Sequence, residues 1–572
     1  MYELKATAGF DAALTEENTA PGIVTLKLTA KSGTAKKLEV RVKWYTEDIG
    51  VNAVWSPLSY RNKTVRPNWG GYYDSNAMRS CPVFSNVAFD DTNRMTIACS
   101  DAKNSVKIRS GVVEENAKLV NEVVINVDCA ISDYTAEIRV DTREIPFYRC
   151  VEDVSKWWET FDGYTPAVVP DTAREPLYSA WYSFHQQIDV PRIVDECRFF
   201  ADLGCKSIIV DDGWQTDNNA RGYAYCGDWE VTPVKIPDMK AFVDAVHETG
   251  LKFVLWYSVP FVGVHSKAYE RFKDKMLGSW GDKGSETYTL DPRYPDVREY
   301  LIDVYRRAKL DWGLDGFKLD FIDSFYQKDE VKEGMDYVSV YDAVDRLMKD
   351  VLAELRKIDP EILIEFRQGY IGPLMRTFGN MLRVADCPND SLSNRVGSLS
   401  LRMTSGGTAV HSDMVMWNYS EPVELAAFQL TNILFAVPQI SVLHDRMPAD
   451  HAKMVKSYLA FWTANRNVLL DGEMFYKGYA ADYNYVSSKL GNAQVGAVYS
   501  GRIAYINELT DRISVVNASM DKDIIFDLGG KNVAYDYTVL DCMGEKVSEG
   551  RLAADFTRVA VPVNGRVELV RA

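Results

Sequence analysis

Apolar and polar residues alternate with a period of two along the first part of the chain. Gly22–Thr29 and Val123–Val127 are examples, and clusters of Gly, Asn and Asp separate such runs. This spacing is typical of β-strands, whereas long helical periodicity is absent before about residue 170. Residues 1–170 are therefore predicted to form an antiparallel β-sandwich.

From about residue 175 short apolar runs alternate with stretches of helical spacing, such as Val190–Leu203. The predicted strands are Leu177–Tyr182, Ser207–Val210, Phe253–Trp256, Gly316–Phe321, Ile362–Ile364, Met381–Ala385, Ala409–His411 and Ile440–Leu443. About eight strand–helix units in roughly 285 residues have the size of a (β/α)8 barrel. Residues 171–465 are expected to form this barrel. A doubly wound sheet is the alternative, but it usually carries a Gly-rich phosphate turn, and the sequence has none.

Strand-like alternation returns after about residue 470, as in Ile513–Val516 and Val559–Val563. Residues 466–572 are predicted to form a small antiparallel β-sandwich. A chain of 572 residues is also too long for a single hydrophobic core, which agrees with three domains.

Charge and cysteine content narrow the classes of function. The formal net charge of -16 disfavours nucleic acid and membrane partners, because both need a basic surface. The 9 cysteines contain no C-x-x-C pair, so neither a disulfide framework nor a thiolate zinc site is expected. No signal-peptide pattern and no bilayer-length apolar run occurs, so we expect a cytoplasmic protein unless a signal peptide was removed.

The clearest chemical signal is Gly316–Phe321, an apolar strand that ends in Lys318 and Asp320. Burying two unpaired charges is costly, so they should lie at the open end of the barrel, where catalysis occurs. Asp211 and Asp212 end an earlier apolar strand in the same way. The other strand ends offer Trp181 and His185, Trp214, Trp256 and Tyr257, Glu365 and Arg367, Arg383 and Asp386, and His411, Asp413 and Trp417.

A ring of carboxylates, cations and indoles suits a sugar, whose hydroxyls take hydrogen bonds and whose apolar face stacks on aromatic rings. Glycosidic cleavage needs one carboxylate at the anomeric centre and a second carboxyl group that protonates the leaving oxygen. Asp320 suits the first role, because Lys318 lies on the same strand face and keeps it ionised. Asp386 suits the second role if it is poorly solvated and stays protonated, although Arg383 could lower its pKa instead.

These residues also have structural interpretations. A lone Asp after a strand, such as Asp390, is commonly a helix N-cap or a turn former. Lys318 and Asp320 could form a simple salt bridge. His185 and His411, and likewise Trp214 and Trp256, could belong to the core.

Taken together, the motifs resemble the retaining α-galactosidases of glycoside hydrolase family 36 and the related family 27. The matching segments are Val210–Trp214, Gly227–Trp229, Leu290–Asp291, Pro295–Arg298 and Lys318-x-Asp320, within about residues 175–400. The resemblance implies that Asp320 is the nucleophile and Asp386 the acid/base. It also implies that Asp211 and Asp212 hold the C4 and C6 hydroxyls of galactose. By the same resemblance, Lys318 binds other hydroxyls and Trp214 forms a subsite wall.

Three segments depart from the family 36 pattern. Trp256–Pro260 replaces a Trp-x-Glu-Pro-Glu run, and Glu365–Tyr370 replaces a Cys-Ser-Gly-Gly-Gly-Gly-Arg run that contacts the C2 hydroxyl in the family. In Ala385–Asp390 the usual Ser-Asp-x-x-Asp spacing is lengthened, so Asp390 rivals Asp386 as the acid/base.

We therefore predict a retaining exo-glycosidase that releases terminal α-galactose from oligosaccharides or glycoconjugates. Its two catalytic carboxyl groups should lie about 5–5.5 Å apart. No metal or organic cofactor is expected, since the 6 histidines are widely scattered. The predicted substrate contacts are Trp181, Asp211, Asp212, Trp214, Trp256, Lys318, Arg367, Arg383, His411 and Asp413.

Other functions stay open. The same fold could act on an α-N-acetylgalactosaminide, a β-L-arabinopyranoside or an α-glucoside. It could also be a transglycosylase resembling raffinose synthases, or a carbohydrate-binding barrel without catalysis. A homo-oligomer is a further expectation by analogy with the family, in which Trp55 and Trp69 would reach a neighbouring site.

Overall fold

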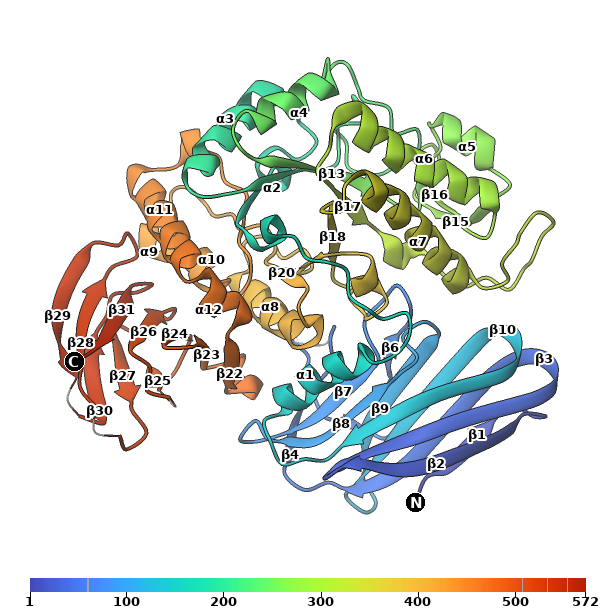
Figure 1. The fold of residues 1–572 in the computed structure, drawn as a ribbon, viewed down its shortest axis with the longest axis horizontal. Helices are drawn as coiled ribbons and strands as arrows, with labels where there is room; N and C mark the ends of the chain where they lie inside the picture. The colour runs from blue at the N-terminus through green and yellow to red at the C-terminus, as the bar shows by residue number, and fades with distance from the viewer. Residues whose placement is uncertain (59–60, 507, 532, 553) are drawn as a thin grey trace.

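The computed structural model describes residues 1–58, 61–506, 508–531, 533–552 and 554–572. Along the chain, a barrel follows an N-terminal region, blue in Figure 1, and precedes a C-terminal region, red in the same view. This order of strand-rich, barrel and strand-rich regions confirms the predicted fold class. The exact limits at residues 170 and 465 stay a proposal.

The N-terminal strands form one large, mostly antiparallel sheet. Its two longest strands, β3 (Ile23–Glu47) and β10 (Lys118–Asp141), pair along nearly their whole lengths. The others are β1 (Glu3–Ala6), β2 (Asp11–Ala20), β4 (Val51–Trp55), β5 (Arg66–Pro67), β6 (Tyr73–Ser75), β7 (Val83–Ala88), β8 (Asn93–Cys99) and β9 (Ser105–Val113). Alternate residues such as Leu26 and Leu28 are buried, which explains the period of two.

The expectation of no long helix before residue 170 is wrong, because α1 (Phe147–Trp158) is a helix of 12 residues. Its buried positions Val151, Val154 and Trp158 recur at a spacing of three and four, so one face of the helix is apolar. The Trp158 indole donates a hydrogen bond to the Cys99 carbonyl at 2.9 Å, which ties the helix to the sheet.

Eight parallel strands form the central barrel. In spatial order they are β20 (Ala409–His411), β19 (Met381–Arg383), β18 (Leu363–Arg367), β17 (Gly316–Asp320), β13 (Lys252–Ser258), β12 (Ser207–Val210), β11 (Leu177–Ser179) and β21 (Gln439–Ile440). A single bridge between His411 and Val437, two residues before β21, joins the two ends of this order. The first strand is shorter than predicted, since residues from Trp181 onward form the short helix α2 (Trp181–Phe184).

Amphipathic helices cover the outside of the barrel (Figure 1). The barrel region contains α3 (Val190–Asp202), α4 (Met239–His247), α5 (Lys267–Phe272), α6 (Pro295–Trp312), α7 (Val340–Ile358), α8 (Ser391–Ser405), α9 (Val423–Ala426), α10 (Phe428–Thr431), α11 (Ala449–Ala464) and α12 (Arg466–Asp471). Ser339 caps α7 by accepting a hydrogen bond from the Asp342 amide, and α6 ends at Gly313, whose φ of 76° suits glycine. Within the described residues, no helix is both long and apolar enough to cross a membrane.

Short 3-10 turns occur at Asp171–Arg174, Ile322–Ser324, Met375–Thr377, His444–Arg446 and Tyr479–Ala481. An additional small antiparallel sheet follows β13 and lies beside the barrel mouth. It consists of β14 (Phe261–Gly263), β16 (Thr287–Leu290) and β15 (Met276–Trp280), with β16 in the middle.

The C-terminal region is mostly antiparallel, as predicted. One sheet contains β22 (Glu473–Lys477), β23 (Tyr485–Leu490), β24 (Ala493–Val498), β26 (Arg512–Asn517), β31 (Arg566–Arg571), β28 (Tyr535–Leu540) and β29 (Lys546–Leu552), and the other contains β25 (Ile503–Tyr505), β27 (Asp523–Asp527) and β30 (Phe556–Ala560).

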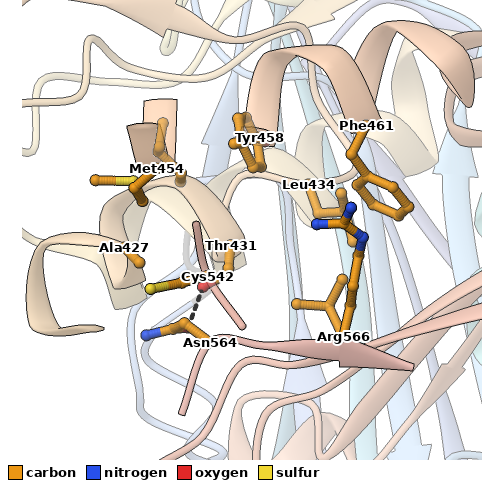
Figure 2. Close-up of a pocket in the computed structure, with 11 residues that line it drawn as sticks. Ala427, Thr431, Leu434, Met454, Tyr458, Phe461, Cys542, Asn564 and Arg566 are labelled. Carbon is orange, nitrogen blue, oxygen red and sulfur yellow. Dashed lines mark hydrogen bonds between the residues drawn. The ribbon is translucent and has the colours of Figure 1, made fainter. Parts of the chain in front are cut away.

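A pocket lies where this region meets the barrel helices (Figure 2). Thr431 donates a hydrogen bond to Asn564 at 2.7 Å, and the Arg566 guanidinium lies over the Phe461 ring. These contacts join the two regions. The pocket contains none of the predicted site residues.

Candidate active site

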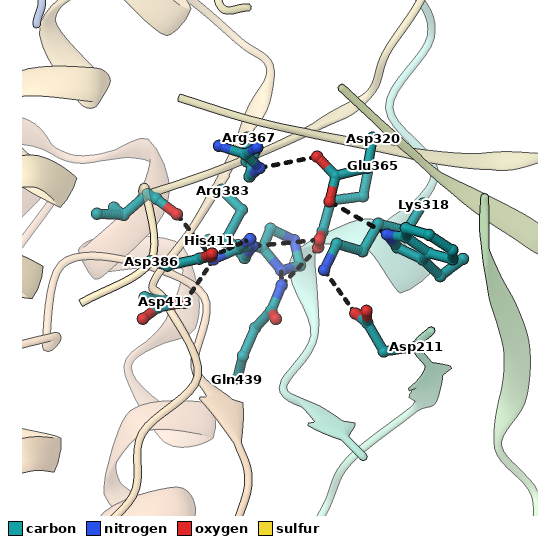
Figure 3. A network of polar contacts seen from close by, with 12 residues as sticks. Asp211, Lys318, Asp320, Glu365, Arg367, Arg383, Asp386, His411, Asp413 and Gln439 are labelled. Atoms are coloured by element: carbon teal, nitrogen blue, oxygen red, sulfur yellow. Dashed lines mark hydrogen bonds and ion pairs between the residues drawn. The ribbon is translucent and has the colours of Figure 1, made fainter. Parts of the chain in front are cut away.

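The C-terminal ends of the barrel strands bring charged side chains together from distant parts of the chain (Figure 3). Lys318 on β17 is paired in register with Trp256 on β13 and with Glu365 on β18. Arg367 on β18 is likewise paired with Arg383 on β19. Because parallel strands in register place these residues in the same layers, their side chains meet at the barrel mouth.

Asp320 is buried and accepts hydrogen bonds on both carboxylate oxygens. Oδ1 accepts from Arg367 Nε at 2.8 Å and from the Tyr370 hydroxyl at 2.5 Å, and Oδ2 accepts from the Trp256 indole at 3.1 Å. Burial raises the pKa of Asp320, but the charges of Arg367 and Lys318 and these hydrogen bonds outweigh it, so the net pKa is well below its usual value. Asp320 is therefore an anion at neutral pH.

Lys318 lies beside Asp320 but forms its own ion pair with Asp211, with Nζ 2.6 Å from Oδ2. Asp212 points to different partners and accepts hydrogen bonds from Gln186 and Gln215 at 2.6 and 2.7 Å. Burial raises the pKa of Asp212 to about 6. The two adjacent aspartates therefore differ in environment, and both lie at the mouth with little exposure to water.

The guanidinium of Arg383 links three carboxylates. It contacts Asp413, donates to Asp386 Oδ1 at 2.8 Å and lies 3.5 Å from Glu365. Burial lowers the pKa of Arg383, but its acidic partners outweigh this and raise it well above the usual value. Since Arg383 is completely buried, it holds its carboxylate partners in fixed positions.

Asp386 differs from the sequence-based expectation of a poorly solvated acid. Its side chain is 54% exposed. Desolvation raises the pKa of Asp386, but the positive charges of Arg383, Lys318 and Arg367 together outweigh it and lower the pKa. Without a bound sugar, this carboxyl group is therefore ionised. Arg383 lowers its pKa, which was the alternative that the sequence left open.

Asp390, the rival acid/base, is the N-cap of α8. Its Oδ1 accepts a hydrogen bond from the Ser393 amide at 2.9 Å, and its Oδ2 lies 3.2 Å from Arg61. This geometry supports the helix-cap interpretation, so Asp386 is the better candidate.

Three further predicted substrate contacts are buried, and their hydrogen bonds go to partners within the protein. Trp214 is completely buried, donates to the Trp256 carbonyl at 2.9 Å and packs against Trp229, which favours the core interpretation. His411 donates a hydrogen bond to the Ala173 carbonyl inside the barrel, and burial lowers its pKa to about 4. Asp413 has no exposed surface and supports Arg383 instead of a sugar.

The remaining aromatic candidates also separate into core and rim. Tyr257 is completely buried, and the Trp417 indole donates to His451 within the core. Trp181 is half-buried and contacts His185 edge to face, so both remain available at the rim. In the N-terminal region, Trp55 is buried against Ser400, which contradicts a role at a neighbour's site, and Trp69 is 76% exposed.

Sequence reasoning missed several residues that fix this site. Tyr370 donates directly to Asp320, Tyr182 donates to Asp413 at 2.9 Å, and Gln439 donates to Glu365 at 2.5 Å. A single tyrosine or glutamine has no characteristic spacing in the sequence. The only local signal was the position of Tyr370 in the unusual segment that follows β18.

The fold and these side chains define a (β/α)8 barrel of the type that glycosidases use, with separate carboxylates at the strand ends. Residues 170–367 match the Melibiase family model. The part of the barrel from β11 through β18 is therefore similar to the melibiase family.

Comparison with known proteins agrees with this similarity. Alpha-galactosidase AgaA of Geobacillus stearothermophilus is 30% identical over 140 residues, which is 23% of this chain and 19% of the relative. "A type blood alpha-D-galactosamine galactosaminidase" of Flavonifractor plautii is 28% identical over 174 residues, which is 27% of this chain and 15% of the relative. The matched segments thus span much less than two thirds of these relatives.

Likeness in fold extends further than likeness in sequence. The crystal structure of GH36 alpha-galactosidase AgaA from Geobacillus stearothermophilus in complex with raffinose has a TM-score of 0.65 at 14% identity. The superposition covers 98% of this chain and 81% of that one. The shared architecture therefore includes both strand-rich regions as well as the barrel.

Proposed function

We propose that this protein is a retaining exo-glycoside hydrolase that releases terminal α-linked galactose from oligosaccharides or glycoconjugates. The observation that carries the proposal is the burial and negative charge of Asp320. It is buried at the mouth of a barrel that is in part similar to melibiases, and its partners keep it anionic. An anionic carboxylate at the barrel mouth suits a nucleophile.

The reaction would proceed in two displacements. Asp320 attacks the anomeric carbon while the bond to the leaving oxygen breaks, and Asp386 gives its proton to that oxygen. In the second step Asp386 takes a proton from water, and the resulting hydroxide displaces Asp320 from the sugar. A bound sugar would cover the exposed face of Asp386 and remove water from it, which raises its pKa toward the value that an acid needs.

Lys318, Asp211 and Asp212 would bind the hydroxyls of the terminal sugar. Lys318 donates only, whereas carboxylates accept, so together they can bind several hydroxyls in one orientation. Asp212 shares its oxygens with Gln186 and Gln215, and these amides fix its direction before the sugar arrives. Trp256 and Arg367 would mainly position Asp320.

A second candidate is the same reaction on an α-N-acetylgalactosaminide. The segment Glu365–Tyr370 replaces the family 36 run that contacts the C2 hydroxyl, and one similar protein is named as a galactosaminidase. Transfer of the sugar to another sugar in place of water is a further alternative with the same first step. A homo-oligomer and a cytoplasmic location stay predictions.

The proposal is tested by hydrolysis of p-nitrophenyl α-galactoside beside the α-N-acetylgalactosaminide, β-L-arabinopyranoside and α-glucoside. We expect release from the α-galactoside and a loss of more than about a thousandfold in Asp320→Asn, because the amide cannot form the glycosyl-enzyme. Circular dichroism should show the same folded state for both proteins. Near-normal turnover by Asp320→Asn would overturn the mechanism, and release from another sugar alone would change the substrate.

A further inference from the structure

A continuous run of aromatic rings leads from the nucleophile to solvent. It begins at Trp256, whose indole donates to Asp320. The ring of Tyr223 is stacked on Trp256 at 6.1 Å between centroids and 26° between planes. Tyr223 also meets Phe321, the residue after Asp320, at 4.9 Å. The inner end of the run is therefore fixed to the candidate catalytic residue.

The outer end of the run is Trp280, the last residue of β15. Its ring lies 5.9 Å from Tyr223 and 5.6 Å from Phe261, both in edge-type contacts. Phe261 is almost completely buried and packs against the rings of both Tyr223 and Trp280. The Tyr326 hydroxyl donates to the Leu277 carbonyl at 2.5 Å, which fixes the strand that carries Trp280.

Trp280 remains 47% exposed although it packs on this cluster. Tyr223 and Phe321 are half-buried, so both residues keep some exposed surface. An exposed aromatic surface next to a polar site is typical of a ligand groove. The exposed part of such a ring adds no burial energy to the free protein. The Arg367 guanidinium over Phe321 connects this surface with the charged site.

We propose that Trp280, Tyr223 and Phe321 form a stacking subsite for the sugar units that follow the terminal one. This inference rests on the proposed function and narrows its substrate to oligosaccharides. Sugars are suitable occupants because each pyranose ring has a polar edge and an apolar face. The polar edge of the terminal sugar would use the Lys318 and Asp211 site, while the next ring would lie on the aromatic surface.

The test compares parent protein and Trp280→Ala on methyl α-galactoside, whose leaving group has no ring, and on raffinose. We expect the KM for raffinose to rise about two- to tenfold, because one aromatic contact contributes that factor in affinity. The kcat, and both constants for the methyl glycoside, should stay unchanged. Trp280→Phe should recover part of the affinity. Phe556→Ala, which removes a ring 64% exposed in the C-terminal region, is the matched control and should change nothing.

A second measurement separates this inference from the proposed function. Raffinose and stachyose are titrated into Asp320→Asn with and without Trp280→Ala, and the binding heat is measured. Affinity that increases with the number of sugar units only when Trp280 is present supports the subsite. Equal or undetectable binding with and without Trp280 overturns it. Failure of the parent to cleave any α-galactoside, with Trp280-dependent binding intact, contradicts only the proposed reaction.

Discussion

At the scale of single residues, the charge of each carboxyl group is set by a few partners. Asp320 and Asp386 both have a lowered pKa, but Asp320 is buried among donors whereas Asp386 is 54% exposed. Sugar binding would therefore change the environment of Asp386 much more than that of Asp320. This difference allows one carboxyl group to remain an anion while the other gains a proton.

Asp413 is expected to influence the pKa of Asp386 through Arg383, which both carboxylates contact. In Asp413→Asn one negative charge is lost, so the Arg383 charge acts more strongly on Asp386 and lowers its pKa further. A catalytic acid with a lower pKa loses its proton at lower pH. The alkaline limb of the kcat profile, which reports the pKa in the complex with sugar, should therefore move down by about one pH unit.

The pH profile checks this role against a merely structural one. Tyr182→Phe removes a hydrogen bond to Asp413 but no charge, so its profile should move less. A lowered kcat with an unmoved alkaline limb in Asp413→Asn would mean that Asp413 only supports the fold.

At the scale of elements, the segment between β19 and α8 has to carry the acid and also begin a helix. Asp386 lies near the end of the strand, and Asp390 satisfies the free Ser393 amide at the start of α8. Two acidic residues four positions apart thus have different tasks. Their sequence spacing does not separate these tasks, because both follow the same apolar strand.

Asp390→Ala should cost about 1 kcal/mol in the free energy of unfolding, the usual effect of losing an N-cap. The exposed contact with Arg61 should add little. Urea unfolding measures the stability, and kcat on the activated galactoside should stay within about twofold. A large fall in kcat without a fall in stability would return Asp390 to the role of acid/base.

At the scale of the whole molecule, the N-terminal region supports the loop that follows β18. The Ser80 amide donates to the Gly369 carbonyl at 2.6 Å, next to Tyr370. A side chain on Gly372 would bring its Cβ within 2.7 Å of the Ser80 carbonyl oxygen. The position of Tyr370, and hence its hydrogen bond to Asp320, thus depends on a segment almost 300 residues earlier in the chain.

Gly372→Ala should therefore lower kcat by about tenfold or more, because a small displacement at a catalytic group has a large effect on rate. Gly407→Ala is the matched control, since no atom lies within 4 Å of its added Cβ. Steady-state kinetics and thermal unfolding should be measured for both variants. Equal kcat in the two would show that the contact with Ser80 does not position the loop.

The sequence by itself determined the elements and the order of the regions. Strand and helix periods depend on neighbours within a few positions, so β12, β13, β17 and α3 lie where the pattern predicts them. The pair Lys318 and Asp320 was also local, because residues two apart share a strand face. The sequence analysis did not predict helix α1, because this helix lies at the end of a long strand-rich stretch.

Only the tertiary structure decided which candidates reach the barrel mouth and how each is charged. Trp214 and Trp256 are both buried, yet Trp256 donates to Asp320. Trp214 instead donates to a backbone carbonyl, that of Trp256. Arg383 meets Asp413, 30 positions away, and Tyr370 meets Asp320, 50 positions away. Burial and pKa depend on such distant partners, because desolvation and Coulomb interactions act through space and not along the chain.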